Sequence, residues 1–175
     1  MMMKNYSIDI DHLAKFQIFR GLRPEEIAPY ADKFNYAEVP ANQMIIKEGE
    51  PGESIYLLLD GEVEISQALT LMMTKQPELD TREKAITRLN NEMYPFFGEM
   101  SIFMDNDIRT ANIRTVTKCQ LAEIHRKDFF AVNHNRPDTG LLVIENIARV
   151  LVERLKKTNN DVIKLTTALA LILEK

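Results

Sequence analysis

The sequence predicts a mainly β domain that is flanked by helices and followed by a long C-terminal helix. Two observations carry this prediction. Between residues 37 and 124, short strand-like runs are separated by glycines, and from Asp138 onward strong helix formers carry an apolar heptad pattern. Several short strands at such spacing are typical of a β sandwich or barrel. A chain of 175 residues is long enough for one such domain and one additional helical element.

Composition narrows the class of protein. Apolar residues make up 45% and charged residues 27% of the chain, which is typical of a soluble globular protein. The formal net charge of −4 argues against a nucleic-acid partner, because such proteins present a basic face. The first twelve residues lack the apolar core of a signal peptide, and the longest apolar run, residues 168–173, is too short to cross a bilayer.

Cys119 is the only cysteine, so no intrachain disulfide can form. A single cysteine between polar neighbours is interpreted as a buried small apolar residue rather than a nucleophile. Together with the composition, it predicts a protein of the reducing cytoplasm, without a membrane partner.

The first 36 residues are expected to form a helical lead-in. Residues 11–19 have the composition of a short helix. Pro24, followed by Glu25 and Glu26, marks the start of a second helix, because proline fits the first helical turn and acidic side chains complement the helix dipole there.

Residues 37–137 are predicted to form the β domain. The expected strands are residues 43–46, 54–59 and 61–66, and the last of these alternates apolar and polar residues as a half-buried strand does. Asp60-Gly61 between two of these strands predicts a two-residue β-hairpin. The stretch 68–81 is expected to be an extended hairpin loop with some helix.

The third predicted region, residues 138–175, is a dimerisation helix. Apolar side chains recur there alternately every four and three residues, at Ile144, Ala148, Leu151, Leu155, Val162, Leu165, Leu169 and Ile172. Such a seam is typical of two paired helices. The alternative is a helix that packs this stripe onto its own barrel. Thr158 occupies the one polar seam position, where a polar residue controls helix register.

A glutamate and an arginine ten residues apart indicate a ligand site. Gly98 permits a close backbone approach, and residues 99–103 can form one helical turn whose free N–H groups favour an anion. Arg109 offers a fork of donors matched to a phosphate, whereas Glu99 suits hydroxyl groups. Phosphate and hydroxyl groups together describe a nucleotide, although an Arg–Glu salt bridge would use the same residue types. Asp105 and Asp107 are expected to be exposed loop residues.

Two motifs resemble those of the cyclic-nucleotide-binding domain family. The first is Phe-Gly-Glu-Met-Ser at residues 97–101 followed by Arg-Thr-Ala at 109–111, and the second is the strand-turn-strand stretch 46–63. The likeness covers about residues 10–160 and implies a β-roll, or jelly-roll, flanked by helices, that binds cAMP or cGMP. A proline commonly precedes the family's arginine, where this chain has Ile108.

The resemblance also implies a role for each residue of the site. Arg109 would hold the cyclic phosphate and Glu99 the ribose 2′-hydroxyl. The remaining backbone and hydroxyl contacts would come, on the phosphate side, from Met100, Ser101, Thr110 and Ala111 and, on the ribose side, from Gly98.

The final helix resembles the dimer helix of bacterial catabolite-activator-type regulators. That likeness gives Thr158, with Asn159, a second interpretation as a contact to adenine at the dimer seam. Thr110 could instead bond the guanine amino group, so the choice between cAMP and cGMP stays open. Only 17 residues follow Thr158, too few for the DNA-binding domain of those regulators, so we expect the output to lie in a separate effector protein.

Three function classes compete. The leading hypothesis is a dimeric cyclic-nucleotide-binding regulatory module that signals to another protein. The second is a structural or interaction module that keeps the fold without the ligand. The third is an enzyme, but His12, His125 and His134 are scattered, without the close spacing of a metal site. We therefore expect neither a metal cofactor nor catalysis.

Overall fold

The computed structural model describes residues 2–3, 9–68, 83–104 and 108–173. Its strands form two antiparallel sheets. One has the order β1-β2-β9-β4-β7 and the other the order β3-β8-β5-β6. The strands of the first sheet are β1 (Met2–Met3), β2 (Asn35–Val39), β9 (Cys119–His125), β4 (Ser54–Asp60) and β7 (Phe96–Phe97). Those of the second are β3 (Met44–Ile46), β8 (Asn112–Thr115), β5 (Glu62–Ala68) and β6 (Glu83–Asn90).

Helices precede, interrupt and follow the strands. They are α1 (Ile10–Leu13), the 3-10 turn η1 (Gln17–Phe19), α2 (Pro24–Ala31), the 3-10 turn η2 (Asn91–Met93), α3 (Glu99–Ile102), α4 (Arg126–Asn135) and α5 (Pro137–Leu173). The predicted fold class, a β-roll with flanking helices and a long C-terminal helix, is confirmed.

Two apolar clusters hold the fold together, one inside the roll and one between the first sheet and the helices. Strand β4 contributes to both, because successive side chains of a strand point to opposite faces. Ile55 and Leu57 pack with the helices, whereas Tyr56 and Leu58 belong to the roll interior. Since both of its faces are covered, β4 is apolar along most of its length.

The predicted hairpin at Asp60-Gly61 is wrong. Strand β4 pairs with β7 and β9, whereas β5 pairs with β6 and β8, so the turn carries the chain from one sheet to the other. Only Gly61 of the pair has a positive φ, of 96°, while a type I′ hairpin requires positive φ at both central residues. A Cβ atom at Gly61 would lie 2.5 Å from the carbonyl oxygen of Lys118, which explains the glycine.

Of the remaining predictions, the start of the second helix is confirmed and the first helix is not continuous. Helix α2 begins at Pro24, as expected, and the Glu26 carboxylate accepts a hydrogen bond from the Arg23 backbone N–H at 2.8 Å. The single helix expected over residues 11–19 is divided into α1 and η1. The predicted loop 68–81 lies outside the described residues, apart from the end of β5.

Helix α5 has two different halves. In its first half, Val143, Ile147 and Val150 are buried against the body of the protein. Each of these residues lies one position before a predicted seam residue, so the seam itself faces away from the body of the protein. Ile144 and Leu151 of the seam only border the core, and from Leu155 onward every seam residue is exposed.

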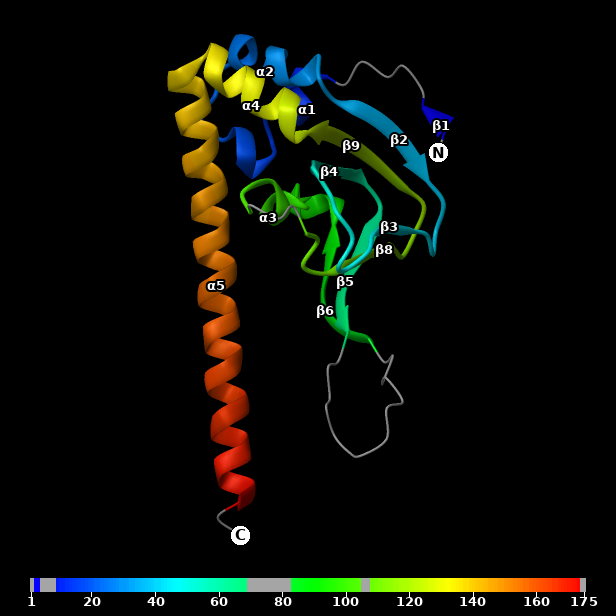
Figure 1. Cartoon of the computed structure of the whole chain (residues 1–175), viewed down its shortest axis with the longest axis vertical. Coiled ribbons are helices and arrows are strands. Elements are labelled where there is room, and N and C mark those ends of the chain that lie inside the picture. Colours follow the sequence, from blue (N-terminus) through cyan, green and yellow to red (C-terminus); the bar gives the residue numbers. More distant parts are fainter. Residues whose placement is uncertain (1, 4–8, 69–82, 105–107, 174–175) are drawn as a thin grey trace.

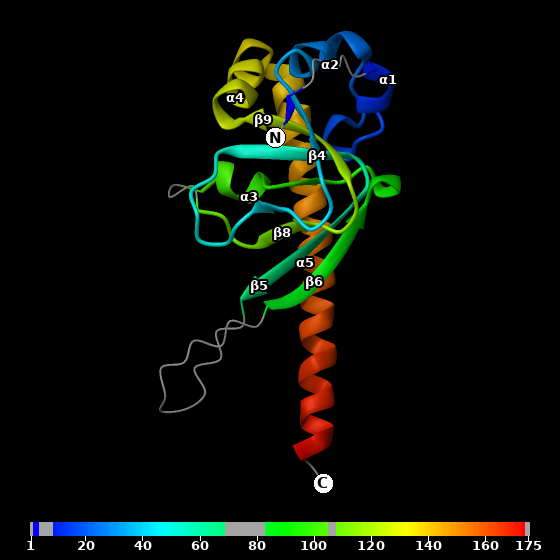
Figure 2. The same cartoon turned by 90° about the vertical axis from the view of Figure 1, so that its right-hand side faces the viewer.

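Figure 1 shows this second half of α5 running past the end of the roll, and Figure 2 shows the same from the side. The interpretation of the stripe as packed on its own roll is therefore wrong for the part of α5 that begins at Leu155. Cys119 is fully buried, as predicted. Within the described residues, no helix has the length and apolar character needed to span a membrane.

Candidate functional site

The residues predicted for the phosphate and ribose sides meet at one cavity of about 90 Å³ between the roll and α5. Figure 1 shows α3, which carries part of this site, on the side of the roll that faces α5. Gly98 precedes α3 with φ 81°, a left-handed conformation that favours glycine. The cavity is lined by Gly98, Glu99, Met100, Ser101, Arg109, Thr110 and Ala111, together with Ile46, Ile65, Phe97, Ile113 and Arg154.

Arg109 is almost completely buried, with 7% of its surface exposed. Its Nη1 donates to the backbone carbonyls of Ser54 and Gly98 and to the Ser101 hydroxyl, each at 2.9 Å. Burial lowers the pKa of the guanidinium, and the carboxylates of Glu123 and Glu99 oppose this shift. The arginine is thus held in place by the roll itself.

Gly52 provides the space in which this side chain lies. A Cβ atom built on Gly52 would stand 1.7 Å from Nε and 2.4 Å from Cζ of Arg109, far inside van der Waals contact. The sequence placed Gly52 only in a turn. Its glycine is explained by the arginine, which comes to it from a distant part of the chain.

Tyr56 forms another wall beside the arginine. The Arg109 Cζ lies 5.8 Å from the centroid of the Tyr56 ring, within the range of a cation–π interaction. The same ring stacks on Phe97, with centroids 5.5 Å apart and planes 16° apart. The Tyr56 hydroxyl donates to Glu123 at 2.8 Å, and burial, followed by the Glu123 charge, raises the pKa of this tyrosine.

Glu99 also lines the cavity and is buried, with 2% of its surface exposed. It is paired with Arg154 of α5, whose Nη1 donates to Oε1 at 2.7 Å. The Nη2 of Arg154 donates to the Phe96 carbonyl at 2.7 Å, and its guanidinium lies 5.2 Å from the Phe96 ring. The alternative of a salt bridge between Glu99 and Arg109 is not what the structure shows, since both side chains have other partners.

Sequence reasoning missed the role of Arg154. A signal for it exists, because Arg154 continues the body-facing stripe of Val143, Ile147 and Val150 at a spacing of three to four residues. A charged residue on a buried stripe needs a buried partner. The seam one position further along is the longer apolar pattern in this helix.

The other predicted residues of the cavity differ in how far they are buried. Ser101 is buried, whereas Met100 is exposed and its sulfur lies 3.6 Å from the Thr110 hydroxyl. The Thr110 carbonyl accepts a hydrogen bond from the Gln67 side chain at 2.6 Å. Asp105 and Asp107 lie outside the described residues.

Thr158 and Asn159 lie apart from the cavity. Both are exposed on α5, one turn beyond Arg154, and neither lines the cavity. The Thr158 hydroxyl donates to the backbone carbonyl of Arg154 at 3.0 Å. A base contact from Thr158 within its own chain therefore has no support in this structure.

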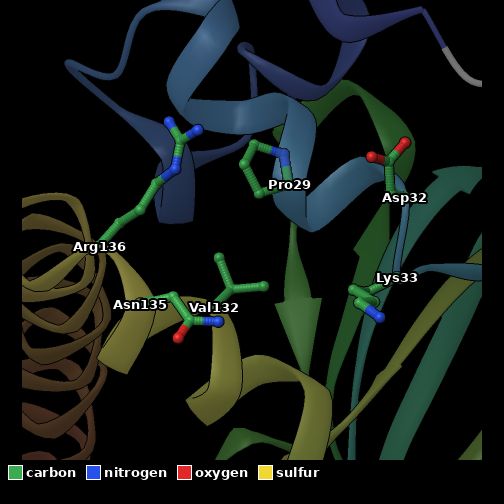
Figure 3. A pocket seen from close by; sticks show the side chains of 6 residues that line it. All are labelled: Pro29, Asp32, Lys33, Val132, Asn135 and Arg136. Carbon is green, nitrogen blue, oxygen red and sulfur yellow. The ribbon is translucent and has the colours of Figure 1, made fainter.

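A second hollow, of about 360 Å³, lies between α2 and α4 (Figure 3). Its cationic side chains have partners, since Lys33 pairs with Asp128 at 3.8 Å and Arg136 donates to the Glu25 carbonyl at 3.1 Å. Over the part of the chain that the structure describes, no three His, Cys, Asp or Glu side chains gather as a metal site would require. The first cavity is taken as the candidate site, because the predicted phosphate-side and ribose-side residues line it.

Comparisons with known proteins match the part of the chain that contains most of the residues lining this cavity. The family model described as the cyclic nucleotide-binding domain matches residues 36–135. The chain is 31% identical over 149 residues to the CRP-like cAMP-activated global transcriptional regulator of Mycobacterium tuberculosis, covering 85% of this chain and 59% of that protein. It is 30% identical to the cAMP-dependent protein kinase regulatory subunit of Emericella nidulans, over 67% of this chain and 25% of that one.

Among solved structures, the Thermus thermophilus catabolite activator protein matches with a TM-score of 0.69 and 27% identity, over 86% of this chain and 63% of that one. The chain thus spans less than two thirds of the length of each of these relatives.

Proposed function

Because the chain belongs to the cyclic nucleotide-binding domain family, we propose that it is a regulatory module that binds cAMP, cGMP or both. One observation carries the proposal. Glu99 and Arg109 are both buried and line the same cavity, yet they form no salt bridge with each other. Such an arrangement suits a ligand with hydroxyl groups at one end and an anion at the other. The proposed role is regulatory and not catalytic.

Arg109 would bind the cyclic phosphate. Within the described residues, the hydrogen bonds of its guanidinium run from Nη1, which leaves the donors of Nη2 for the ligand. A phosphate accepts such charge-assisted bonds strongly. Ser101, Met100, Thr110 and Ala111 would complete this side from the cavity wall.

Glu99 would bind the ribose 2′-hydroxyl, with Gly98 beside it. Its Oε1 is bonded to Arg154, and a carboxylate has a second oxygen that can accept from a hydroxyl. Arg154 then serves to hold Glu99 in position, and it links the sugar side of the site directly to α5.

The cavity must widen when the ligand binds. Its volume of about 90 Å³ is below the roughly 300–1,000 Å³ of ordinary ligand pockets. Because Glu99 and Phe96 are both bonded to Arg154, widening on the sugar side shifts the contact with α5. A ligand moves such an equilibrium by its difference in affinity for the two states. We propose this shift as the signal.

The proposed module is a homodimer that acts on a separate effector protein in the cytoplasm. The exposed seam of α5, from Leu155 to its end, supports the pairing, because apolar side chains at heptad spacing are buried when two helices associate. No nucleic-acid or membrane partner belongs to the proposal. The same small cavity also favours the second candidate, a structural module that binds no nucleotide.

Calorimetric titration with cAMP and with cGMP separates the two candidates. We expect dissociation constants in the micromolar range for at least one nucleotide. Absence of binding by both nucleotides below millimolar concentrations would leave the structural module as the better description.

Sedimentation equilibrium tests the dimer. Leu165→Asp, in the seam, is expected to give monomers, whereas Ile163→Asp is the matched control, because both residues are 62% exposed but Ile163 lies outside the seam. Equal association of both variants and the wild type would contradict pairing through the seam.

A further inference from the structure

Glu123 is a carboxylate on the inner face of the roll. It lies in β9 between Ala122 and Ile124, which face the helices, so its own side chain points with Leu121 to the roll interior. A charge placed among apolar side chains needs a hydrogen-bond partner. Glu123 accepts a hydrogen bond from the Tyr56 hydroxyl at 2.8 Å.

Packing supports the guanidinium of Arg109 as well as hydrogen bonds. Within the described residues, its three hydrogen bonds to Ser54, Gly98 and Ser101 all come from Nη1. The Nε and Cζ atoms lie instead against Gly52, so closely that a Cβ atom there would clash with them. The Tyr56 ring, 5.8 Å from Cζ, packs beside the same group and so bears on the angle at which its outer edge lies.

Tyr56 in turn has space to move. A cavity of about 480 Å³ opens beside it, between β2, β3 and β9, and Tyr56 and Glu123 both line it. Without its bond to Glu123, the ring can tilt toward this cavity. A hydroxyl bonded to a carboxylate also makes the ring face more electron-rich, which strengthens its attraction for a cation.

We propose that Tyr56, held by Glu123, is a positioning residue that sets the orientation of the Arg109 guanidinium toward the ligand. This inference rests on the proposed function, since it concerns how Arg109 presents its free edge to a cyclic phosphate. The sequence placed Tyr56 in a strand and Glu123 in no site, and the pair forms only because β4 and β9 are neighbours.

The test uses Tyr56→Phe, which keeps the ring, and Glu123→Gln, which keeps an acceptor but removes the charge. Tyr36→Phe is the matched control, because Tyr36 is also half-buried and bonded through its hydroxyl, to Ala31, but on the helix side of the sheet. Each variant is titrated with the Rp and Sp phosphorothioates of the cyclic nucleotide, which differ only in which exocyclic oxygen is replaced by sulfur.

We expect the ratio of the Rp and Sp affinities to change at least about threefold in Tyr56→Phe and in Glu123→Gln, and to stay constant in Tyr36→Phe. In an Arg109→Lys background the same substitutions should have no further effect on the ratio. An unchanged ratio in both variants, even with weaker overall binding, would overturn the proposal, because a purely structural defect affects the two diastereomers equally.

A second measurement does not depend on the ligand. The NMR signal of the Arg109 Nε–H group in the ligand-free protein should shift or broaden in Tyr56→Phe but not in Tyr36→Phe. If the wild type binds no cyclic nucleotide, this signal still decides the positioning role, so the two proposals can fail separately. An Arg109 signal that is identical in all three proteins would overturn the positioning role.

Discussion

The two sides of the candidate site are held by different parts of the molecule. On the proposed phosphate side, Arg109 is bonded to backbone and hydroxyl groups of the roll itself. On the proposed sugar side, Glu99 is bonded to Arg154, which comes from α5. The roll alone therefore fixes one half of the site, whereas the other half depends on the position of a helix. We infer that the phosphate side sets affinity and that the sugar side transmits the signal.

The largest expected effect comes from the phosphate side. Arg109→Ala should weaken cyclic-nucleotide binding by roughly 30-fold to 1,000-fold, because a buried charge pair contributes about 2–4 kcal/mol when one partner is removed. Calorimetric titration measures this difference. Arg88→Ala, at an exposed arginine of β6 that pairs with Glu64, is the control and should bind like the wild type. Equal affinity in Arg109→Ala and wild type would contradict the inference that the phosphate side sets affinity.

On the sugar side, Arg154→Gln should act mainly on stability and signalling. It leaves the buried Glu99 carboxylate without its cation, which we expect to lower the free energy of unfolding by roughly 1–2 kcal/mol, less than for a fully buried pair. The expected loss is smaller than for a fully buried pair because the Arg154 side chain is 38% exposed, so solvent screens its charge. Urea unfolding of the ligand-free protein measures this change.

Arg149→Gln provides the matched control on the same helix. Its pairing with Glu145 is exposed on both sides, so the free energy of unfolding should change by less than about 0.5 kcal/mol. A label near the end of α5 should report a ligand-dependent change in the wild type and in Arg149→Gln but not in Arg154→Gln. A ligand-dependent change that survives in Arg154→Gln would separate α5 from the sugar side.

A substitution at Gly52 tests whether the position of Arg109 controls binding on the phosphate side. Gly52→Ala places a Cβ against Nε of Arg109 at a backbone position without positive φ, so the arginine must move while the turn can persist. We expect about tenfold weaker nucleotide binding. In an Arg109→Ala background the same substitution should have no effect on affinity, which calorimetry of the four proteins tests as a double-mutant cycle.

Gly21→Ala controls for general destabilisation. Gly21 has φ +83°, lies near Leu142 and does not line the cavity, so an alanine there strains the backbone without meeting Arg109. It should lower stability and leave affinity unchanged. If Gly52→Ala weakened binding equally with and without Arg109, the space around the arginine would not be the reason for the glycine.

The sequence predicted those parts of the molecule whose signals are local. The run from Gly98 to Ser101 and the residues Arg109 to Ala111 line one cavity, as their motif implied, and the heptad spacing led to α5. Each of these patterns lies within one segment of chain. A pattern within one segment is therefore enough to select these residues, and their roles toward a ligand stay a prediction.

The remaining features depend on which segments become neighbours. Arg154 meets Glu99 across 55 residues, and Tyr56 meets Glu123 across 67, because of the way α5 crosses the roll and β4 pairs with β9. The hairpin at Asp60-Gly61 failed for the same reason, since its local turn signal lost to the pairing of β4 and β5 in separate sheets. All three features depend on contacts between segments that are distant in the sequence, and local sequence patterns do not reveal such contacts.

The smallest expected effects concern the base, for which the two sides offer one candidate each. Thr110 belongs to the phosphate side, and Thr110→Ala should weaken cGMP about threefold while leaving cAMP unchanged, as the loss of one neutral hydrogen bond would do. Thr158 belongs to α5, and Thr158→Ala should weaken cAMP by a similar factor. Parallel titrations with both nucleotides measure these changes.

The two substitutions also differ in their dependence on the dimer. Thr158 is exposed and does not line the cavity of its own chain, so a contact with adenine must reach the cavity of a second copy. The effect of Thr158→Ala should therefore disappear in the Leu165→Asp background, whereas that of Thr110→Ala should persist. If both effects persisted in the monomer, α5 would act within its own chain, and the sugar side would need no partner to complete the site.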